Sequence, residues 1–167
     1  MDVAPAWREN AAAMEICDAC RPPEIAEVRM LFREYAAQVD APACFAAFEE
    51  ELAALPGEYA PPSGRLLLAR DDDRAAGCAA LRRLPDGSGE MKRLYVRAPF
   101  RGAGLGRELA RSVIASARDG GCTRLVLDTL PTMRAAAVLY ESLGFRRIAA
   151  YSPAPTPGAI FFELSLS

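Results

Sequence analysis

A cluster of glycines offers the clearest chemistry in this sequence. Gly102, Gly104 and Gly106 lie within five positions, after a strand-like segment and at the start of a helix-like one. Because a glycine inside a helix costs about 1 kcal/mol relative to alanine, the helix itself does not favour them. A backbone without side chains lets a ligand approach the unpaired amide N–H groups and the positive end of the helix dipole. The segment 101–106 therefore predicts a binding site for phosphate groups.

Three alternatives compete with a phosphate site at this loop. A glycine-rich turn could merely let the helix pack on the strand. A dinucleotide-binding fingerprint has the spacing G-x-G-x-x-G, whereas the third glycine here comes one residue early. Asp128 could imitate the ribose-binding acid of such a site, but hairpins before the loop oppose that fold. A Walker loop is excluded, because neither Gly-Lys-Ser nor Gly-Lys-Thr occurs.

The composition removes other kinds of chemistry. The 167 residues include 20 basic and 22 acidic side chains, a formal net charge of −2, and no histidine. Histidine-dependent nucleophilic catalysis, histidine metal sites and the usual general base near neutral pH are therefore excluded. No global positive field would hold nucleic acid or an anionic bilayer, so we expect neither as a partner. An anionic ligand has to be bound locally.

The cysteines and the acidic triplet can be explained without a chemical role. The odd number of cysteines, five, fits a reducing cytosol better than secretion, and we expect a cytoplasmic protein. Cys17 and Cys20 form a C-x-x-C pair, which could bind a metal or act in redox chemistry. The second pair that a zinc site needs is missing. The alternative is that both are simply half-buried side chains. The triplet 71–73 is interpreted as a solvated turn, because it lacks the spacing and glycine of a calcium loop. No metal is expected.

The elements that must position the glycine loop follow from hydrophobic periodicity and from glycine and proline breakers. The first predicted helix begins near residue 23. Three further predicted helices cover residues 43–54, 105–119 and 131–143. The predicted strands cover residues 14–18, 65–70, 77–84, 90–96, 123–128, 145–151 and 159–166.

The lengths of the connections predict how these strands pair. The connections at 71–73 and 85–89 are too short for a crossover helix and fit antiparallel hairpins. The connection from 90–96 to 123–128 contains a helix, so this pair should be parallel with a right-handed crossover. The sequence therefore predicts a mixed, largely antiparallel α/β sheet that is not doubly wound.

Several segments, taken in order, resemble the GNAT-type N-acetyltransferase family. They are Glu90–Val96 (EMKRLYV), Pro99, the R-x-x-G-x-G loop at 101–106, and Leu139–Phe145 (LYESLGF). The resemblance is close over 90–145 and looser in the flanks. It implies an α/β (α+β) fold with a mixed, mostly antiparallel central sheet, about four flanking helices, and a splayed parallel pair at the CoA site. It also implies one domain over residues 13–167. Residues 1–12 are rich in alanine, with Pro5, and are expected to be a flexible lead-in.

The resemblance implies acetyl-CoA as cosubstrate, without a metal. In the family the pyrophosphate lies on the glycine-rich loop, and the pantetheine arm pairs like a strand with the backbone of the preceding strand. The binding residues that the resemblance implies are Leu94, Val96, Arg101, Gly102, Ala103, Gly104, Leu105, Gly106 and Arg107.

Two catalytic residues are implied in the same way. An amine must lose its proton to attack, and an ammonium with a pKa of about 10 is mostly protonated near neutral pH, so a base within reach helps. Glu90 matches the position where the family often places a glutamate base; the alternative is a solvated glutamate paired with Lys92 or Arg93. Tyr140 matches the tyrosine that protonates the departing CoA thiolate, and the alternative is a core aromatic.

The remaining expectations concern the oxyanion, the CoA arm and a covalent route. The oxyanion would be held by the backbone N–H of Val96, where the sheet splays. Many relatives carry an asparagine that contacts the CoA arm, but Thr129–Met133 occupies its place here. Because no histidine activates Cys122, we expect direct attack in a ternary complex and no acyl-cysteine.

The predicted function is therefore transfer of acetyl from acetyl-CoA to an amine of a small molecule, or of a protein or peptide. Segments 35–48 and 151–157 would shape the acceptor site. The alternative is a non-catalytic acyl-CoA-binding sensor or regulatory module, which needs the glycine loop but neither Glu90 nor Tyr140. The sequence is compatible with a homodimer.

Overall fold

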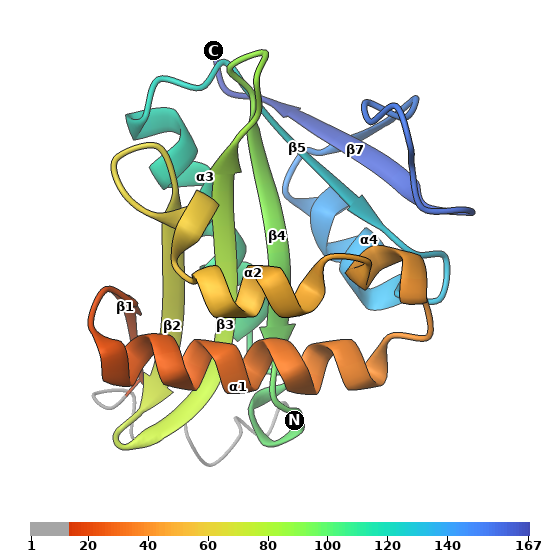
Figure 1. Ribbon diagram of the computed structural model, residues 1–167. Helices are drawn as coiled ribbons and strands as arrows, with labels where there is room; N and C mark the ends of the chain where they lie inside the picture. Colours follow the sequence, from red (N-terminus) through yellow and green to blue (C-terminus); the bar gives the residue numbers. More distant parts are fainter. Residues whose placement is uncertain (1–13) are drawn as a thin grey trace, which may run out of the picture.

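A seven-stranded sheet forms the centre of the protein, with strand order β1-β2-β3-β4-β5-β7-β6 (Figure 1). The computed structural model describes residues 14–167, so the lead-in expected over residues 1–12 lies outside the described residues. Neighbouring strands are antiparallel except β4 and β5, which are parallel. The predicted mixed, mostly antiparallel sheet is confirmed. Its strands are β1 (Met14–Asp18), β2 (Arg65–Asp71), β3 (Arg74–Arg83), β4 (Gly89–Val96), β5 (Arg124–Thr129), β6 (Arg146–Ile148) and β7 (Ile160–Ser165).

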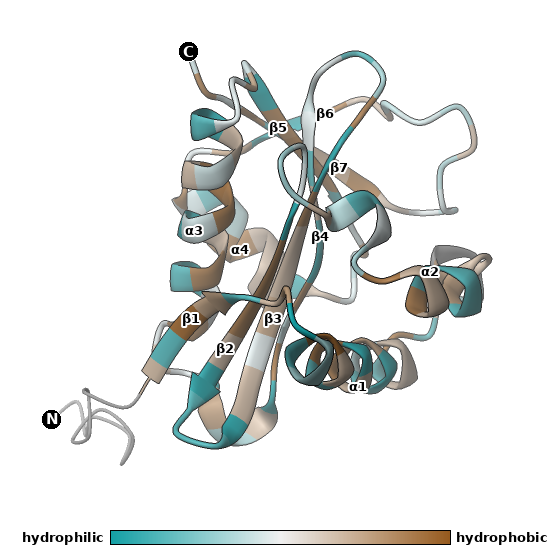
Figure 2. Cartoon of the chain, turned by 60° about the vertical axis from the view of Figure 1, so that its left-hand side comes forward, coloured by the Kyte–Doolittle hydropathy of each residue, from teal (hydrophilic) through white to brown (hydrophobic). Residues whose placement is uncertain are grey.

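Four α-helices cover the two faces of the sheet. They are α1 (Pro22–Gln38), α2 (Phe48–Ala54), α3 (Leu105–Asp119) and α4 (Arg134–Ser142). Figure 2 shows α1 and α2 on one face and α3 and α4 on the other. Within residues 14–167, no helix is both long enough and apolar enough to cross a membrane.

The sequence of β2 reflects this covering of both faces. Successive side chains of a strand point to opposite faces. Leu66 and Leu68 pack in the core under α1 and α2, whereas Leu67 and Ala69 pack in the core against α3. A strand that is buried on both faces reads as a continuous apolar run rather than an alternating one.

Two predicted elements differ most from the structure in their extent. The helix expected over 43–54 is split into a 3-10 turn, Pro42–Phe45, and α2, because Ala47 between them has the non-helical angles φ −115° and ψ 32°. The rings of Phe45 and Phe48 both lie against the guanidinium of Arg93, at 4.7 and 5.5 Å, so tertiary contacts prevail over helical periodicity here. The strand expected over 145–151 is only the three-residue β6.

A β-bulge interrupts the pairing of β3 with β4. Cys78 pairs with Tyr95 and Ala80 pairs with Lys92, so two residues of β4 face one residue of β3. Arg93 in the bulge has φ +58°, which is unusual for a residue with a side chain. A bulge bends its strand and redirects side chains, and such features often lie beside active sites.

The parallel pair opens soon after it begins. The register of β4 with β5 covers only Gly89 with Leu125 and Glu90 with Val126. Beyond these residues the two strands diverge toward their C-terminal ends (Figure 1). The predicted splayed parallel pair is therefore present, and it leaves one edge of β4 unpaired from residue 91 onward.

The ion pair between Arg93 and Glu51 joins α2 to this part of β4. The Arg93 guanidinium donates two hydrogen bonds to the Glu51 carboxylate, at 3.0 and 3.1 Å, and its side chain is only 8% exposed. Tyr59 donates a third hydrogen bond to Glu51 at 3.0 Å.

We expect Glu51→Ala to lower the free energy of unfolding by roughly 3 kcal/mol, because it strands a buried guanidinium. Glu49→Ala is the matched control. It also removes an acid from the first turn of α2, but its partner Arg33 is exposed, so a loss below about 1 kcal/mol is expected. Urea denaturation measures both variants. Equal losses would show that the Arg93 pair contributes no more than a surface pair.

Candidate active site

A cavity of about 240 Å³ lies where β4 and β5 diverge. Its walls come from α1, β4, the end of β5, α4 and the loop between β6 and β7. The lining residues on which the chemistry depends are Tyr35, Glu90, Lys92, Leu94, Asp128, Tyr140 and Tyr151. The site thus collects residues that lie more than a hundred positions apart in the sequence.

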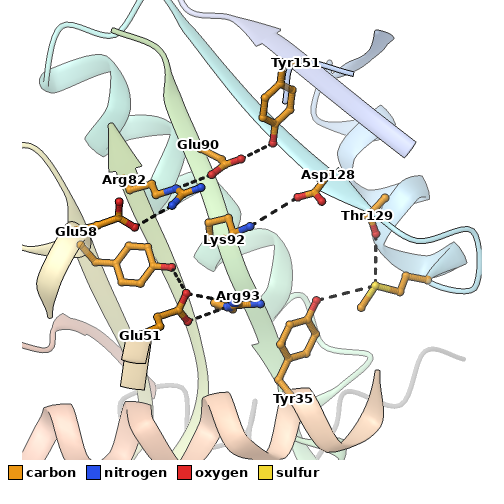
Figure 3. A network of polar contacts seen from close by, with 12 residues as sticks. Tyr35, Glu51, Glu58, Arg82, Glu90, Lys92, Arg93, Asp128, Thr129 and Tyr151 are labelled. Atoms are coloured by element: carbon orange, nitrogen blue, oxygen red, sulfur yellow. Dashed lines mark hydrogen bonds and ion pairs between the residues drawn. The ribbon is translucent and has the colours of Figure 1, made fainter. Parts of the chain in front are cut away.

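Glu90 is buried at the wall of this cavity, with 3% of the residue exposed. Arg82 Nε donates a hydrogen bond to Glu90 Oε1 at 2.6 Å, and the Tyr151 hydroxyl donates one to Oε2 at 2.5 Å (Figure 3). Arg82 also donates to Glu58 at 2.8 Å, which fixes the guanidinium from its other side. Both carboxylate oxygens of Glu90 are therefore held in place.

The alternative expected for Glu90, a solvated glutamate paired with Lys92 or Arg93, is wrong. Arg93 is bound to Glu51, and Lys92 lies nearest to Asp128 (Figure 3). The partner of Glu90 is instead Arg82, which faces it directly across the β3–β4 pair.

Tyr151 anchors the loop between β6 and β7 to the rest of the site. Its ring packs edge-on against Phe161, with ring centroids 5.4 Å apart. Burial, and next the negative charge of Glu90, raise the pKa of the Tyr151 phenol well above its ordinary value. The phenol therefore keeps its proton and acts as the hydrogen-bond donor. Sequence reasoning included Tyr151 only in a loop that shapes the acceptor site.

Tyr140 serves as both core aromatic and cavity wall. Its ring packs against Phe145 and Phe162, with centroids 5.7 and 5.9 Å away, and it also lines the cavity. Burial, followed by the charges of Tyr35 and Asp128, raises the pKa of the Tyr140 phenol. A phenol that stays protonated can donate a proton, so the two interpretations of Tyr140 are compatible.

The open edge of β4 exposes main-chain groups beside the cavity. Arg97 N–H donates to Ala76 O of β3 at 2.9 Å. Because backbone groups alternate along a strand, those of Leu94 and Val96 point away from β3, toward the side from which β5 has diverged. Leu94 lines the cavity, and Val96 is absent from the described lining residues. The Val96 carbonyl accepts a hydrogen bond from Arg101 Nε at 2.7 Å.

The glycine loop has the backbone that a ligand site needs. Gly102 has φ +81°, and Gly104, the N-cap of α3, has φ +90°. The first intrahelical bond is donated by Glu108 N–H to Gly104 O, so the amides at 105–107 precede it. A Cβ added at Gly106 would meet only ordinary contacts of 3.8 Å, so packing does not require this glycine. That result disfavours the interpretation as a mere packing turn at this position.

Both arginines that border the loop are held by neighbouring side chains. Arg107 donates to the Ser142 hydroxyl at 2.7 Å, which ties α3 to α4. Arg101 donates to Gln38 at 3.1 Å, and Gln38 in turn donates to the Tyr95 hydroxyl at 3.0 Å. The loop is thereby coupled to the C-terminal end of α1, next to the cavity residue Tyr35.

The segment Thr129–Met133, which stands where many relatives carry an asparagine, leads from β5 into α4. The Thr129 hydroxyl lies 3.5 Å from Met133 Sδ, and the Tyr35 hydroxyl lies 4.0 Å from the same sulfur (Figure 3). Met133 thus connects α1 with the start of α4 across the cavity wall.

The four cysteines whose side chains the structure describes, Cys17, Cys20, Cys78 and Cys122, do not line this cavity. Cys17 lies half-buried on the edge strand β1, Cys20 is exposed and Cys122 is buried. Burial, and next the charge of Glu24, raise the pKa of the Cys17 thiol, which opposes thiolate formation. Among the side chains described for residues 14–42 and 45–167, no three Cys, Asp or Glu residues gather as a metal site would require.

Comparisons with known proteins agree with this geometry. The model of the acetyltransferase (GNAT) family matches residues 25–145. An uncharacterized N-acetyltransferase of Schizosaccharomyces pombe is 36% identical over 148 residues, which cover 87% of this chain and 91% of that protein.

Solved structures share the whole fold. A protein of Klebsiella pneumoniae described as an acyl-CoA N-acyltransferase is 31% identical, with a TM-score of 0.70 that covers 93% of this chain and 99% of the other. An acetyltransferase of Salmonella typhimurium, solved with its cofactor acetyl-CoA, has a TM-score of 0.68 at 20% identity and covers 93% of this chain and 95% of its own. This chain belongs to the GNAT family of acetyltransferases.

Proposed function

We propose that this enzyme transfers the acetyl group of acetyl-CoA to an amine by direct attack while both substrates are bound. The observation that supports this proposal is the arrangement around one cavity of a buried carboxylate, a buried phenol and an open strand edge. The fold places these three groups at the point where β4 and β5 part.

In this proposal, acetyl-CoA binds along β4 and the start of α3. The pyrophosphate lies on the amides of the glycine loop, where the helix dipole favours negative charge. The pantetheine arm pairs with the outward backbone groups of Leu94 and Val96. The Arg101 side chain, now bonded to the Val96 carbonyl, then has to share that oxygen with the arm or release it.

Glu90 acts as the base for the acceptor amine. Arg82 fixes one carboxylate oxygen and leaves the other oxygen directed at the Tyr151 hydroxyl. An amine that gives its proton to Glu90 therefore either replaces this hydroxyl or passes the proton through it. The neutral nitrogen can then attack the acetyl carbonyl carbon.

Collapse of the intermediate breaks the bond between carbon and sulfur. The thiolate of CoA takes the proton of the Tyr140 phenol, which is protonated at neutral pH. The nitrogen of the new amide gives up its second proton in the same collapse, and this proton restores the phenol. We place the oxyanion donor at the main-chain N–H of Leu94 rather than at that of Val96, because Leu94 lines the cavity beside the bulge.

The proposed CoA site is tested by a substitution with opposite effects on folding and binding. Gly106→Asp puts a carboxylate in the first turn of α3, where the helix dipole stabilises it by about 0.3–1 kcal/mol. The same charge repels the phosphates, so we expect acetyl-CoA affinity to fall more than tenfold while the melting temperature does not fall.

Gly106→Ala serves as the control, because the site accommodates a Cβ. Calorimetric titration with acetyl-CoA and with NAD measures the affinities. Wild type and the alanine variant should both bind acetyl-CoA in preference to NAD. Undiminished acetyl-CoA binding by Gly106→Asp, or a preference of the wild type for NAD, would contradict the proposed site.

A further inference from the structure

Lys92 and Asp128 differ from the other charged residues of the cavity. Among the charged side chains that the structure describes there, these two alone make no hydrogen bond with their charged groups. Lys92 Nζ lies 3.9 Å from the nearest Asp128 oxygen, and both side chains are largely buried. A ligand that supplies well-placed opposite charges therefore improves the interactions of both residues.

Lys92 is the cation of the lining that can best receive an anionic group of the ligand. Arg82 is hydrogen-bonded to Glu90 and Glu58, and Arg93 is hydrogen-bonded to Glu51. Lys92 has only Asp128 nearby, at 3.9 Å. A carboxylate would find Lys92, whose donors are uncommitted, and would share hydrogen bonds that are charge-assisted.

The spacing along β4 limits the distance between the amine and this carboxylate. Glu90 and Lys92 are two residues apart on one strand, so their side chains start about 7 Å apart. Both side chains line the cavity, so an amine at Glu90 and a carboxylate at Lys92 can belong to one small molecule in which few bonds separate the two groups.

We infer that the acceptor is a free α- or β-amino acid, with its nitrogen directed toward Glu90 and Tyr151 and its carboxylate bound by Lys92. This inference rests on the proposed function. It excludes the N-terminal amine of a peptide as the preferred acceptor, because a peptide has a neutral amide where the free amino acid has its carboxylate.

The test compares acceptors that differ only in the carboxylate. Thiol release from acetyl-CoA gives kcat/KM for leucine, leucinamide and isoamylamine, and for the equivalent sets of alanine and phenylalanine. Spermidine and a short peptide complete the panel. We expect kcat/KM for each amino acid to exceed kcat/KM for its amide about tenfold to a hundredfold. This factor corresponds to the free energy of one hydrogen bond to a charged group.

Lys92→Gln identifies the residue responsible, with the acid-to-amide ratio as an internal control within each variant. We expect this ratio to fall close to one in Lys92→Gln and to be largely kept in Lys92→Arg. Acetyl-CoA binding, measured by calorimetry, checks that each variant is folded.

The outcomes separate the inference from the proposed function. Amides, spermidine or peptide acetylated as well as or better than the amino acids would overturn the inference alone, as would an unchanged ratio in Lys92→Gln. Absence of turnover with every compound, despite acetyl-CoA binding, would contradict the proposed transfer itself.

Discussion

Replacing Glu90 by glutamine is expected to lower kcat for amine acetylation by about 10²- to 10⁴-fold, the usual contribution of a general base. Glutamine keeps the size of the side chain and an oxygen that Arg82 can bind, so acetyl-CoA affinity should change little. Because the amide accepts no proton near neutral pH, the acceptor amine loses its base. Stopped-flow or steady-state thiol release measures kcat, and calorimetry measures the affinity.

Glu58→Gln is the matched control for this variant. It also removes a carboxylate partner of Arg82, but Glu58 is 68% exposed and lies outside the described cavity lining. A change in kcat below about threefold is expected, since exposed ion pairs contribute little. Similar losses in the two variants would mean that Glu90 acts only by holding Arg82.

Tyr140→Phe is expected to reduce kcat by about 10²-fold, the lower end of the range for a general acid. The ring still packs against Phe145 and Phe162, so the free energy of unfolding should change little. Thermal unfolding and thiol release measured on the same preparation separate the two effects.

Tyr95→Phe provides the comparison for Tyr140. Its hydroxyl is hydrogen-bonded to Gln38 and lies on the α1 face of β4, outside the described cavity lining. Loss of this hydroxyl should leave kcat within about threefold, because it meets no reacting atom. Full activity of Tyr140→Phe would reduce Tyr140 to a core aromatic.

Much of the fold was predictable because local sequence determines it. The short connections at 71–73 and 85–89 permit only hairpins, and the glycine loop marks the start of α3. The split of the helix expected over 43–54 was not predictable, because the rings on either side of it contact Arg93, a residue of a distant strand. The bulge at Arg93 was likewise not predictable, because it contains no glycine or asparagine, the residues that usually indicate a positive φ.

The candidate site was only partly predictable for the same reason. The hairpin at 85–89 already places Arg82 opposite Glu90, so this ion pair had a detectable sign in the sequence. Tyr151 had none, since it reaches Glu90 from a loop 61 positions away. The pairing of Lys92 with Asp128 depends on how far β4 and β5 diverge, which hydrophobic periodicity does not specify.

Direct transfer is tested most directly by following both products of one reaction. The full chain is incubated with isotopically labelled acetyl-CoA and the amine panel, and mass spectrometry quantifies free CoA, acetylated amine and acetylated protein. Direct attack predicts free CoA and N-acetylated amine in equal amounts, with no labelled acetyl group on a cysteine of the chain. Release of CoA without acetylated amine, or an acetyl-cysteine that forms and decays during turnover, would contradict it.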